Sequence, residues 1–247
     1  MDLFFTPGGK IDLQAGRLSI EGDEFHHLVR VLRKKTGDRL LAADGRGLRC
    51  EVVITAVGKK SVDGEILGHR FVGKPATEVA VAFSLLRTSQ RFDFFLEKST
   101  ELGISSIIPM VTTRTVSQPS NEKIEGKLER WRSIVLAAAK QSKRFYFPEI
   151  GRPLHFREVL RLDGFDNRLI AFEGSSTPPS AGFARKKTLF LIGPEGGFVP
   201  NEVEEARAAG FRDVTFGKTI LRAETAAVFA VAMVRARLLD EECEELM

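Results

Sequence analysis

Cysteine is scarce in this chain of 247 residues, which contains only Cys50 and Cys243, far apart in the sequence. Two such thiols fit neither a disulfide framework nor a cysteine-based zinc site, so we expect a reduced protein without a metal. No run of about 18 apolar residues is present, so no segment is expected to span a membrane. The first residues, MDLFFTPGGKIDL, lack a basic segment followed by a long apolar one. No secretory signal is therefore predicted, and the expected compartment is the cytoplasm.

Internal repeats and low-complexity segments are also missing, while hydrophobic residues make up 43% and charged residues 28% of the chain. This composition excludes wholesale disorder. The length suits one large domain or two modest ones, at about 100–200 residues each, with enough chain to bury a core.

Charge is unevenly distributed along the chain, although the net charge is only +4. Seven basic and two acidic residues lie between His27 and Arg49, and thirteen basic and seven acidic residues lie between Ser84 and Arg157. The last ten residues hold five acids and no base. Two separate basic segments favour a polyanionic partner such as a nucleic acid; an ordinary solvated surface is the alternative.

Residues 1–73 have the pattern of short strands and turns. Helical spacing interrupts it at 23–35, where Asp23 is a candidate N-cap. A small β-barrel with one helix, followed by a linker at 73–75, is therefore predicted. Its strands are expected at 16–22, 38–47, 48–58 and 61–72.

After the linker, predicted strands alternate with predicted helices, which is typical of a parallel sheet covered on both faces. Trp131 shares the apolar face of one long helix, so we expect it in the core. The strands are expected at 78–86, 104–111, 168–173, 188–193 and 213–217, and the helices at 91–103, 122–141, 200–210 and 224–239.

The clearest local signal is LFLIGPEGGF, residues 189–198, in which a buried strand runs into Gly193–Gly197. Glycines let a backbone approach a ligand closely, and open α/β sheets bind ligands at the carboxyl ends of their strands. The segment has neither the Lys-Ser/Thr ending of a P-loop nor the GxGxxG pattern, and Glu195 would repel a phosphate. A ligand with little negative charge is favoured; a tight turn without a ligand is the alternative.

Two further strand ends lead into glycine-bearing loops, IAFEGSSTPP at 170–179 and TFGKTILRAETAA at 215–227. Five strings, HHLVRVLR, EKSTELGISSIIP, LERWRSIVLAAAKQSKR, LIGPEGGF and GKTILRAETA, occur in an order that resembles one family. The chain is similar over nearly its whole length to the 16S ribosomal RNA (uracil-N3) methyltransferases of the α/β-knot (SPOUT) class.

The resemblance implies an α/β protein with a PUA-like, RNA-binding β-barrel at 1–73 and a trefoil-knotted methyltransferase domain at 74–247. It implies S-adenosylmethionine as the cofactor and a homodimer packed through helices of the knotted domain. An adenine and a sulfonium cation, without phosphates, suit the loops described above. The implied cofactor-binding residues are Phe172, Glu173, Gly174, Ile192, Gly193, Pro194, Glu195, Gly196, Gly197, Phe216, Gly217, Ile220, Leu221, Arg222, Thr225 and Ala226.

Uridine N3 carries a proton, so a cationic group near O2 or O4 would stabilise the anion that forms when this proton leaves. The candidates for this catalytic role are Arg114, Arg144 and Arg222. Glu224 is interpreted as a residue that favours the start of the last helix. The RNA-binding candidates are Arg30, Arg33, Lys34, Lys35, Lys143 and Arg144.

Three places depart from the pattern of the family. Lys218-Thr219 stands where Pro-Arg is usual, and Lys143 and Phe145 stand where Gly and Asn are common. The third is RTSQRF at 87–92, at the end of the first strand after the linker, which lacks the usual Gly after a basic residue. The first departure removes an arginine from the third loop, and the second removes a polar contact.

The predicted function is S-adenosylmethionine-dependent methylation of N3 of a specific uridine in 16S ribosomal RNA of the small subunit. The general base, the target nucleotide and the assembly state of the substrate are left open. One alternative is a ribose 2′-O RNA methyltransferase of the same superfamily, which the segment LRAETA disfavours because it lacks the Asn-bearing motif of those enzymes. Another is a non-catalytic RNA-binding or ribosome-assembly factor.

Overall fold

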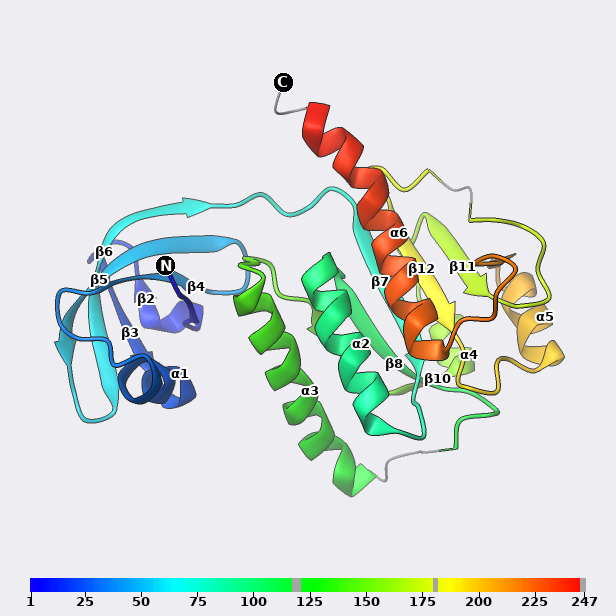
Figure 1. Cartoon of the computed structure of the whole chain (residues 1–247), viewed down its shortest axis with the longest axis horizontal. Coiled ribbons are helices and arrows are strands. Elements are labelled where there is room, and N and C mark those ends of the chain that lie inside the picture. Colours follow the sequence, from blue (N-terminus) through cyan, green and yellow to red (C-terminus); the bar gives the residue numbers. More distant parts are fainter. Residues whose placement is uncertain (117–120, 180–181, 245–247) are drawn as a thin grey trace. The chain divides into compact units, whose positions relative to one another are not determined.

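The chain divides into two compact units in the computed structural model, which describes residues 1–116, 121–179 and 182–244. The first unit comprises Met1–Lys74 and Ala139–Phe147, and the second comprises Pro75–Ala138 and Pro148–Met247. Figure 1 traces both units in the colours of the sequence. The domains predicted from the sequence were continuous, so the return of residues 139–147 to the first unit is a difference.

The first unit is built on one six-stranded sheet in the order β1-β4-β5-β6-β3-β2. Along β5, Cys50, Val52 and Ile54 alternate with more exposed residues and enter the core, as expected of a strand with one buried face. Cys50 is free, and burial raises the pKa of its thiol to about 11. The strands are β1 (Leu3–Phe5), β2 (Ile11–Asp12), β3 (Arg17–Glu21), β4 (Arg39–Ala43), β5 (Leu48–Val57) and β6 (Ser61–Phe71).

The predicted helix of this unit is shorter than its pattern. It consists of α1 (Gly22–His26) and one wider π-type turn, η2 (His27–Val31). The prediction of Asp23 as its N-cap is wrong, because β3 runs directly into the helix at Gly22, whose φ of +64° makes the turn. A short 3-10 helix, η1 (Gly8–Lys10), precedes β2.

Residues 139–147 join the first unit through backbone and apolar contacts. The N–H of Gly47 donates to the carbonyl of Phe145 at 2.8 Å, and that of Phe147 donates to Gly45 at 3.0 Å. The ring of Phe145 packs against a small buried cluster of Leu3, Leu41 and Ala43. Phe145, which stands where the family pattern has Asn, therefore contributes an apolar contact to this unit in place of a polar side chain.

The second unit is built on a parallel sheet in the order β10-β8-β7-β12-β11-β13, with β9 paired to β8. Its longer strands lie where the sequence predicted them, whereas the short β9, β10 and α4 had no clear pattern. The strands are β7 (Glu78–Ser84), β8 (Ser106–Val111), β9 (Glu149–Ile150), β10 (Leu154–His155), β11 (Asn167–Ala171), β12 (Lys187–Ile192) and β13 (Arg212–Val214).

Helices cover both faces of this sheet. Val79, Val81 and Phe83 of β7 face a core with α2, α3 and α6, while Ala80 and Ala82 face α4 and α5 (Figure 1). Trp131 of α3 is buried in the first of these cores, as predicted. The helices are α2 (Ser89–Leu102), α3 (Asn121–Gln141), α4 (Phe156–Val159), α5 (Pro200–Ala208) and α6 (Ala223–Glu244). Among the described residues, no helix is long and apolar enough to cross a membrane.

Sheet order places the three glycine-bearing loops at one edge. Strands β12, β11 and β13 are neighbours and run in the same direction, so their carboxyl ends lie together. The order of strands reverses between β7 and β12, which is the point where open α/β sheets bind ligands. After β13 the chain returns to α6, which packs on α2, β7 and β12.

Candidate functional site

A cavity of about 440 Å³ opens at the carboxyl ends of β11, β12 and β13. This volume is within the range of small-molecule sites in proteins. The three loops predicted from the sequence supply most of its wall. The lining residues are Arg91, Ala171, Phe172, Glu173, Ile192, Gly193, Pro194, Glu195, Gly196, Gly197, Phe198, Val214, Thr215, Phe216, Gly217, Lys218, Thr219, Ile220, Leu221, Arg222, Ala223 and Ala226.

The loop after β12 is tightly packed around its first glycine. A Cβ on Gly193 would lie 3.2 Å from the ring of the buried Phe198 and 3.3 Å from the backbone of Gly197. Gly197 itself has a φ of +67°, and its N–H donates to the carbonyl of Pro194 at 2.9 Å to close the turn. The sequence of this loop is therefore required by its shape, and that shape forms one wall of the cavity.

Part of the loop after β13 has a backbone that makes no hydrogen bonds to the described residues. Thr215 fixes its start, because the hydroxyl donates to the carbonyl of Gly217 at 3.1 Å. From Lys218 to Leu221, no backbone N–H or C=O group makes a hydrogen bond within the described part of the chain. These groups line the cavity and can serve a ligand with donors and acceptors of its own. The departure at Lys218-Thr219 thus lies in the cavity wall.

Arg91, on the first turn of α2, faces two carboxylates of these loops. Its Nη1 lies 4.0 Å from Oε1 of Glu195, and its Nε lies 3.7 Å from Oε1 of Glu224. Arg91 is not among the site residues predicted from the sequence, because nothing in the pattern of α2 distinguishes it from a surface arginine. Glu224 is buried, and within the described residues its Oε2 accepts no hydrogen bond. Its interpretation as a residue that favours the start of α6 therefore stays a prediction.

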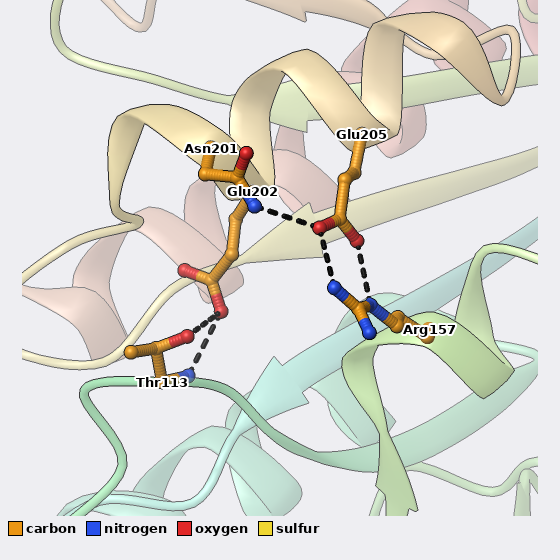
Figure 2. A network of polar contacts seen from close by, with 5 residues as sticks. All are labelled: Thr113, Arg157, Asn201, Glu202 and Glu205. Carbon is orange, nitrogen blue, oxygen red and sulfur yellow. Dashed lines mark hydrogen bonds and ion pairs between the residues drawn. The ribbon is translucent and has the colours of Figure 1, made fainter.

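A buried carboxylate ties the loop after β12 to the loop after β8. Oε1 of Glu202 accepts hydrogen bonds from the backbone N–H of Thr113 at 2.8 Å and from its hydroxyl at 3.0 Å. Oε2 accepts from the N–H of Val199 at 2.9 Å. Figure 2 shows Glu202 beside a second link, in which Arg157 of α4 donates two hydrogen bonds to Glu205 of α5.

The three arginines proposed for catalysis occupy different places. Arg222 lines the cavity. Arg114 follows β8, and its guanidinium donates to the carbonyl of Gly196 at the glycine loop. Arg144 belongs to the first unit, whereas Arg114 and Arg222 belong to the second. The roles of all three stay predictions.

Two of the implied cofactor-binding residues lie outside the cavity lining. Gly174 lies under the ring of Phe172, where a Cβ would be 2.6 Å from that ring. Thr225 lines a second cavity beside the first. The described residues contain no group of three or more His, Cys, Asp or Glu side chains that could hold a metal ion.

The RNA-binding candidates gather in the first unit, although they come from two distant parts of the sequence. Arg30, Arg33 and Lys35 are exposed, and Lys34 is half-buried and lies 3.3 Å from the carboxylate of Asp2. Lys143 is exposed, with a φ of +53°. This left-handed conformation favours glycine, which explains why Gly is common at this position in the family.

Two family models match the chain. An RNA methyltransferase domain covers residues 73–235, and an RNA methyltransferase PUA domain covers residues 20–67. The first match alone spans well over half of the chain. By fold and site, the protein is thus an RNA methyltransferase.

Individual relatives narrow this class. The chain is 34% identical to ribosomal RNA small subunit methyltransferase E from Synechocystis, over 87% of the chain and 71% of the relative. It is 29% identical to the protein of the same name from Bacillus subtilis, over 90% of each. The chain belongs to the family of ribosomal RNA small subunit methyltransferase E.

A solved structure agrees with this assignment. The crystal structure of ribosomal RNA small subunit methyltransferase E from Neisseria gonorrhoeae bound to S-adenosyl methionine superimposes with a TM-score of 0.85, at 29% identity. The match covers 96% of this chain and 97% of that one. The predicted fold class is confirmed: an α/β protein with a PUA-like N-terminal domain and a methyltransferase domain of the α/β-knot type.

Proposed function

We propose that this protein transfers the methyl group of S-adenosylmethionine to N3 of a uridine in 16S ribosomal RNA of the small ribosomal subunit. The observation that carries the proposal is the cavity at the carboxyl ends of β11, β12 and β13, built from the three loops of the family pattern. The relative from Neisseria gonorrhoeae, described as bound to the same cofactor, supports it.

The residues of the cavity fit this cofactor. Apolar side chains, among them Phe172, Ile192 and Leu221, suit an adenine ring, and the unbonded backbone of the third loop suits its polar edge. Glu173 and Glu195 bring negative charge, which favours a cation and opposes a phosphate. When bound, S-adenosylmethionine supplies a methyl group on a positively charged sulfur, which keeps the electron pair of the broken bond.

The contribution of this chain is mainly to hold two reactants in line, an effect worth at most about 7–11 kcal/mol. The loops after β11, β12 and β13 hold one reactant. Arg222 adds a cation at the cavity, where it can stabilise negative charge on uracil as the N3 proton leaves. Arg114 orients the carbonyl of Gly196 and thereby fixes the glycine loop.

The PUA-like domain binds the RNA backbone through Arg30, Arg33, Lys34 and Lys35, by charge rather than by sequence. The active form is a homodimer. The exposed apolar side chains of Phe229 and Leu239 on α6 support this part of the proposal, because they suit burial against a second copy.

The test is methyl transfer from labelled S-adenosylmethionine to small ribosomal subunits and to naked 16S RNA, followed by digestion to nucleosides and mass spectrometry. N3-methyluridine supports the proposal, and a 2′-O-methylated nucleoside supports the ribose alternative. Gly193→Val places a side chain against the buried ring of Phe198 and the backbone of Gly197 and is expected to abolish transfer. The matched control is Gly126→Ala in α3, where an added Cβ meets nothing within 4 Å. If the wild-type protein binds RNA but does not bind S-adenosylmethionine and does not transfer methyl groups, it is a non-catalytic factor.

A further inference from the structure

A second cavity, of about 520 Å³, lies beside the cofactor cavity and shares Arg91 and Arg222 with it. Its wall comes from the first turns of two helices, α2 and α6. The lining residues are Thr88, Gln90, Arg91, Phe94, Arg222, Glu224 and Thr225.

Two charged side chains of this cavity, Arg91 and Glu224, lack close side-chain hydrogen bonds within the described structure. The guanidinium of Arg91 makes only the two ion pairs of 3.7 and 4.0 Å, both longer than a hydrogen bond. Glu224 is 8% exposed, and its Oε2 has no hydrogen-bond partner. A buried carboxylate without hydrogen bonds is costly, so a ligand that donates to it would be stabilised there.

The chemistry of these groups complements one nucleobase edge. Uracil presents two carbonyl acceptors, O2 and O4, on either side of the N3–H donor. Arg91 and Arg222 are donors only, and an ionised Glu224 is an acceptor only. Cytosine has an unprotonated N3 and an amino group on this edge, so it would set an acceptor against the carboxylate.

An aromatic side chain is available for the face of the base. Phe94 of α2 lines the cavity and is 45% exposed, so its ring is accessible to a ligand. Proteins that recognise single-stranded RNA commonly stack unpaired bases on such rings.

We propose that this second cavity holds the acceptor uracil, with Phe94 against its face, Arg91 and Arg222 on its carbonyl oxygens, and Glu224 on N3–H. The inference deepens the proposed function and rests on it. Glu224 takes the N3 proton, and the electron pair of the broken N–H bond stays on N3 as the pair that accepts the methyl group. The two arginines stabilise the negative charge that this leaves on O2 and O4.

Nucleotide binding tests the cavity without any methyl transfer, so its failure is separate from failure of the proposed function. Full-length protein with labelled threonine methyl groups is titrated with uridine 5′-monophosphate and, separately, with cytidine 5′-monophosphate. We expect shifts at Thr88 and Thr225 with the uridine nucleotide, weaker shifts with the cytidine nucleotide, and loss of the difference in Glu224→Gln. Equal shifts with both nucleotides, or shifts confined to Thr215 and Thr219, would overturn the assignment.

The pH profile of single-turnover methyl transfer tests the role of Glu224. A general base contributes about 10²–10⁴-fold, so Glu224→Gln is expected to lose this factor near neutral pH. The loss should shrink as the pH approaches the value at which the uracil imide ionises by itself. A loss that is the same at every pH, or weakened S-adenosylmethionine binding by calorimetry, would make Glu224 structural. Glu97→Gln, an exposed carboxylate on α2, is the matched control.

Phe94 and Arg91 provide tests that do not depend on a buried residue. Phe94→Ala is expected to raise KM for small subunits at least about fivefold, with rescue by Phe94→Tyr. Arg91→Gln should lower kcat, while the methylated nucleoside that forms stays the same. If Phe94→Ala instead changes the sedimentation of the protein and leaves KM unaltered, Phe94 belongs to the dimer interface and the stacking role is wrong.

Discussion

The carboxylate of Glu202 accepts two hydrogen bonds from Thr113, a residue 89 positions earlier in the chain, at 2.8 Å from the backbone N–H and 3.0 Å from the hydroxyl. This contact joins the start of α5 to the loop after β8. The neighbouring Arg114 reaches the carbonyl of Gly196 from the same loop. Figure 2 shows the contact of Thr113 with Glu202. With Arg114, it attaches the loop after β8 to the segment from the glycine loop to α5.

Glu202→Gln should lower the free energy of unfolding by about 1–3 kcal/mol, because the amide replaces one acceptor oxygen and leaves a partly buried donor unpaired. Urea unfolding followed by circular dichroism measures this. Glu204→Gln, on the same helix but in an exposed ion pair with Arg207, is the control and should change stability by at most about 1 kcal/mol. Equal stability of Glu202→Gln and wild type would show that the contact with Thr113 contributes nothing.

Alanine at the two glycines of the loop after β12 should have unequal effects on cofactor binding. At Gly193 the new Cβ meets the buried ring of Phe198 and the backbone of Gly197, so the loop must move. At Gly196 it meets only Cδ of Arg114 at 3.3 Å, and that exposed side chain can shift. We expect Gly193→Ala to weaken binding of S-adenosylmethionine more strongly than Gly196→Ala does. Calorimetry measures both affinities. The reverse order would place the cofactor elsewhere along the loop.

Much of the candidate site could be predicted, because the order of strands and loops in the sequence indicates where the loops lie in a parallel sheet. Parallel strands deliver their following loops to one edge, so three glycine-bearing loops had to lie together. The rule works at the level of loops and not of single side chains. It does not distinguish Phe172, which lines the cavity, from Gly174, which lies under its ring, or Arg222 from Thr225, which faces the second cavity.

The contacts that could not be predicted join residues with no local signal. Arg91 faces Glu224 across 133 positions, and Glu202 faces Thr113 across the sheet edge. The return of residues 139–147 to the first unit likewise depends on the packing of Phe145, which a helical pattern cannot reveal. Lys143, at a φ of +53°, was visible only as a departure from the family pattern.

Asp213 gives the fold a dependence on acid. Arg207 donates to its carboxylate at 3.0 Å and lowers its pKa below the ordinary value of 3.8. A lowered folded pKa means that ionised Asp213 stabilises the fold above the unfolded pKa, and that this stabilisation is lost as the pH falls through the lower, folded value. Asp213→Asn should therefore be less stable than wild type between pH 5 and 7 by a constant amount, and the gap should close below about pH 4. Urea titrations across this range measure the gap, and one that persists at acid pH would contradict the role of the charge.

RNA binding by the PUA-like domain should depend steeply on salt, because neutralising phosphates releases their counterions. Each lost phosphate contact reduces the slope of log affinity against log salt by about 0.7–0.9. Arg33→Gln combined with Lys35→Gln, both at exposed positions, should therefore lower the slope for 16S RNA by about 1.4–1.8, measured by filter binding at several salt concentrations. Lys10→Gln is the control, because Lys10 lies in the same unit but is paired with Glu21 at 2.9 Å. A flat salt dependence of the wild type, or an equal change in the control, would mean that the RNA is held by another surface.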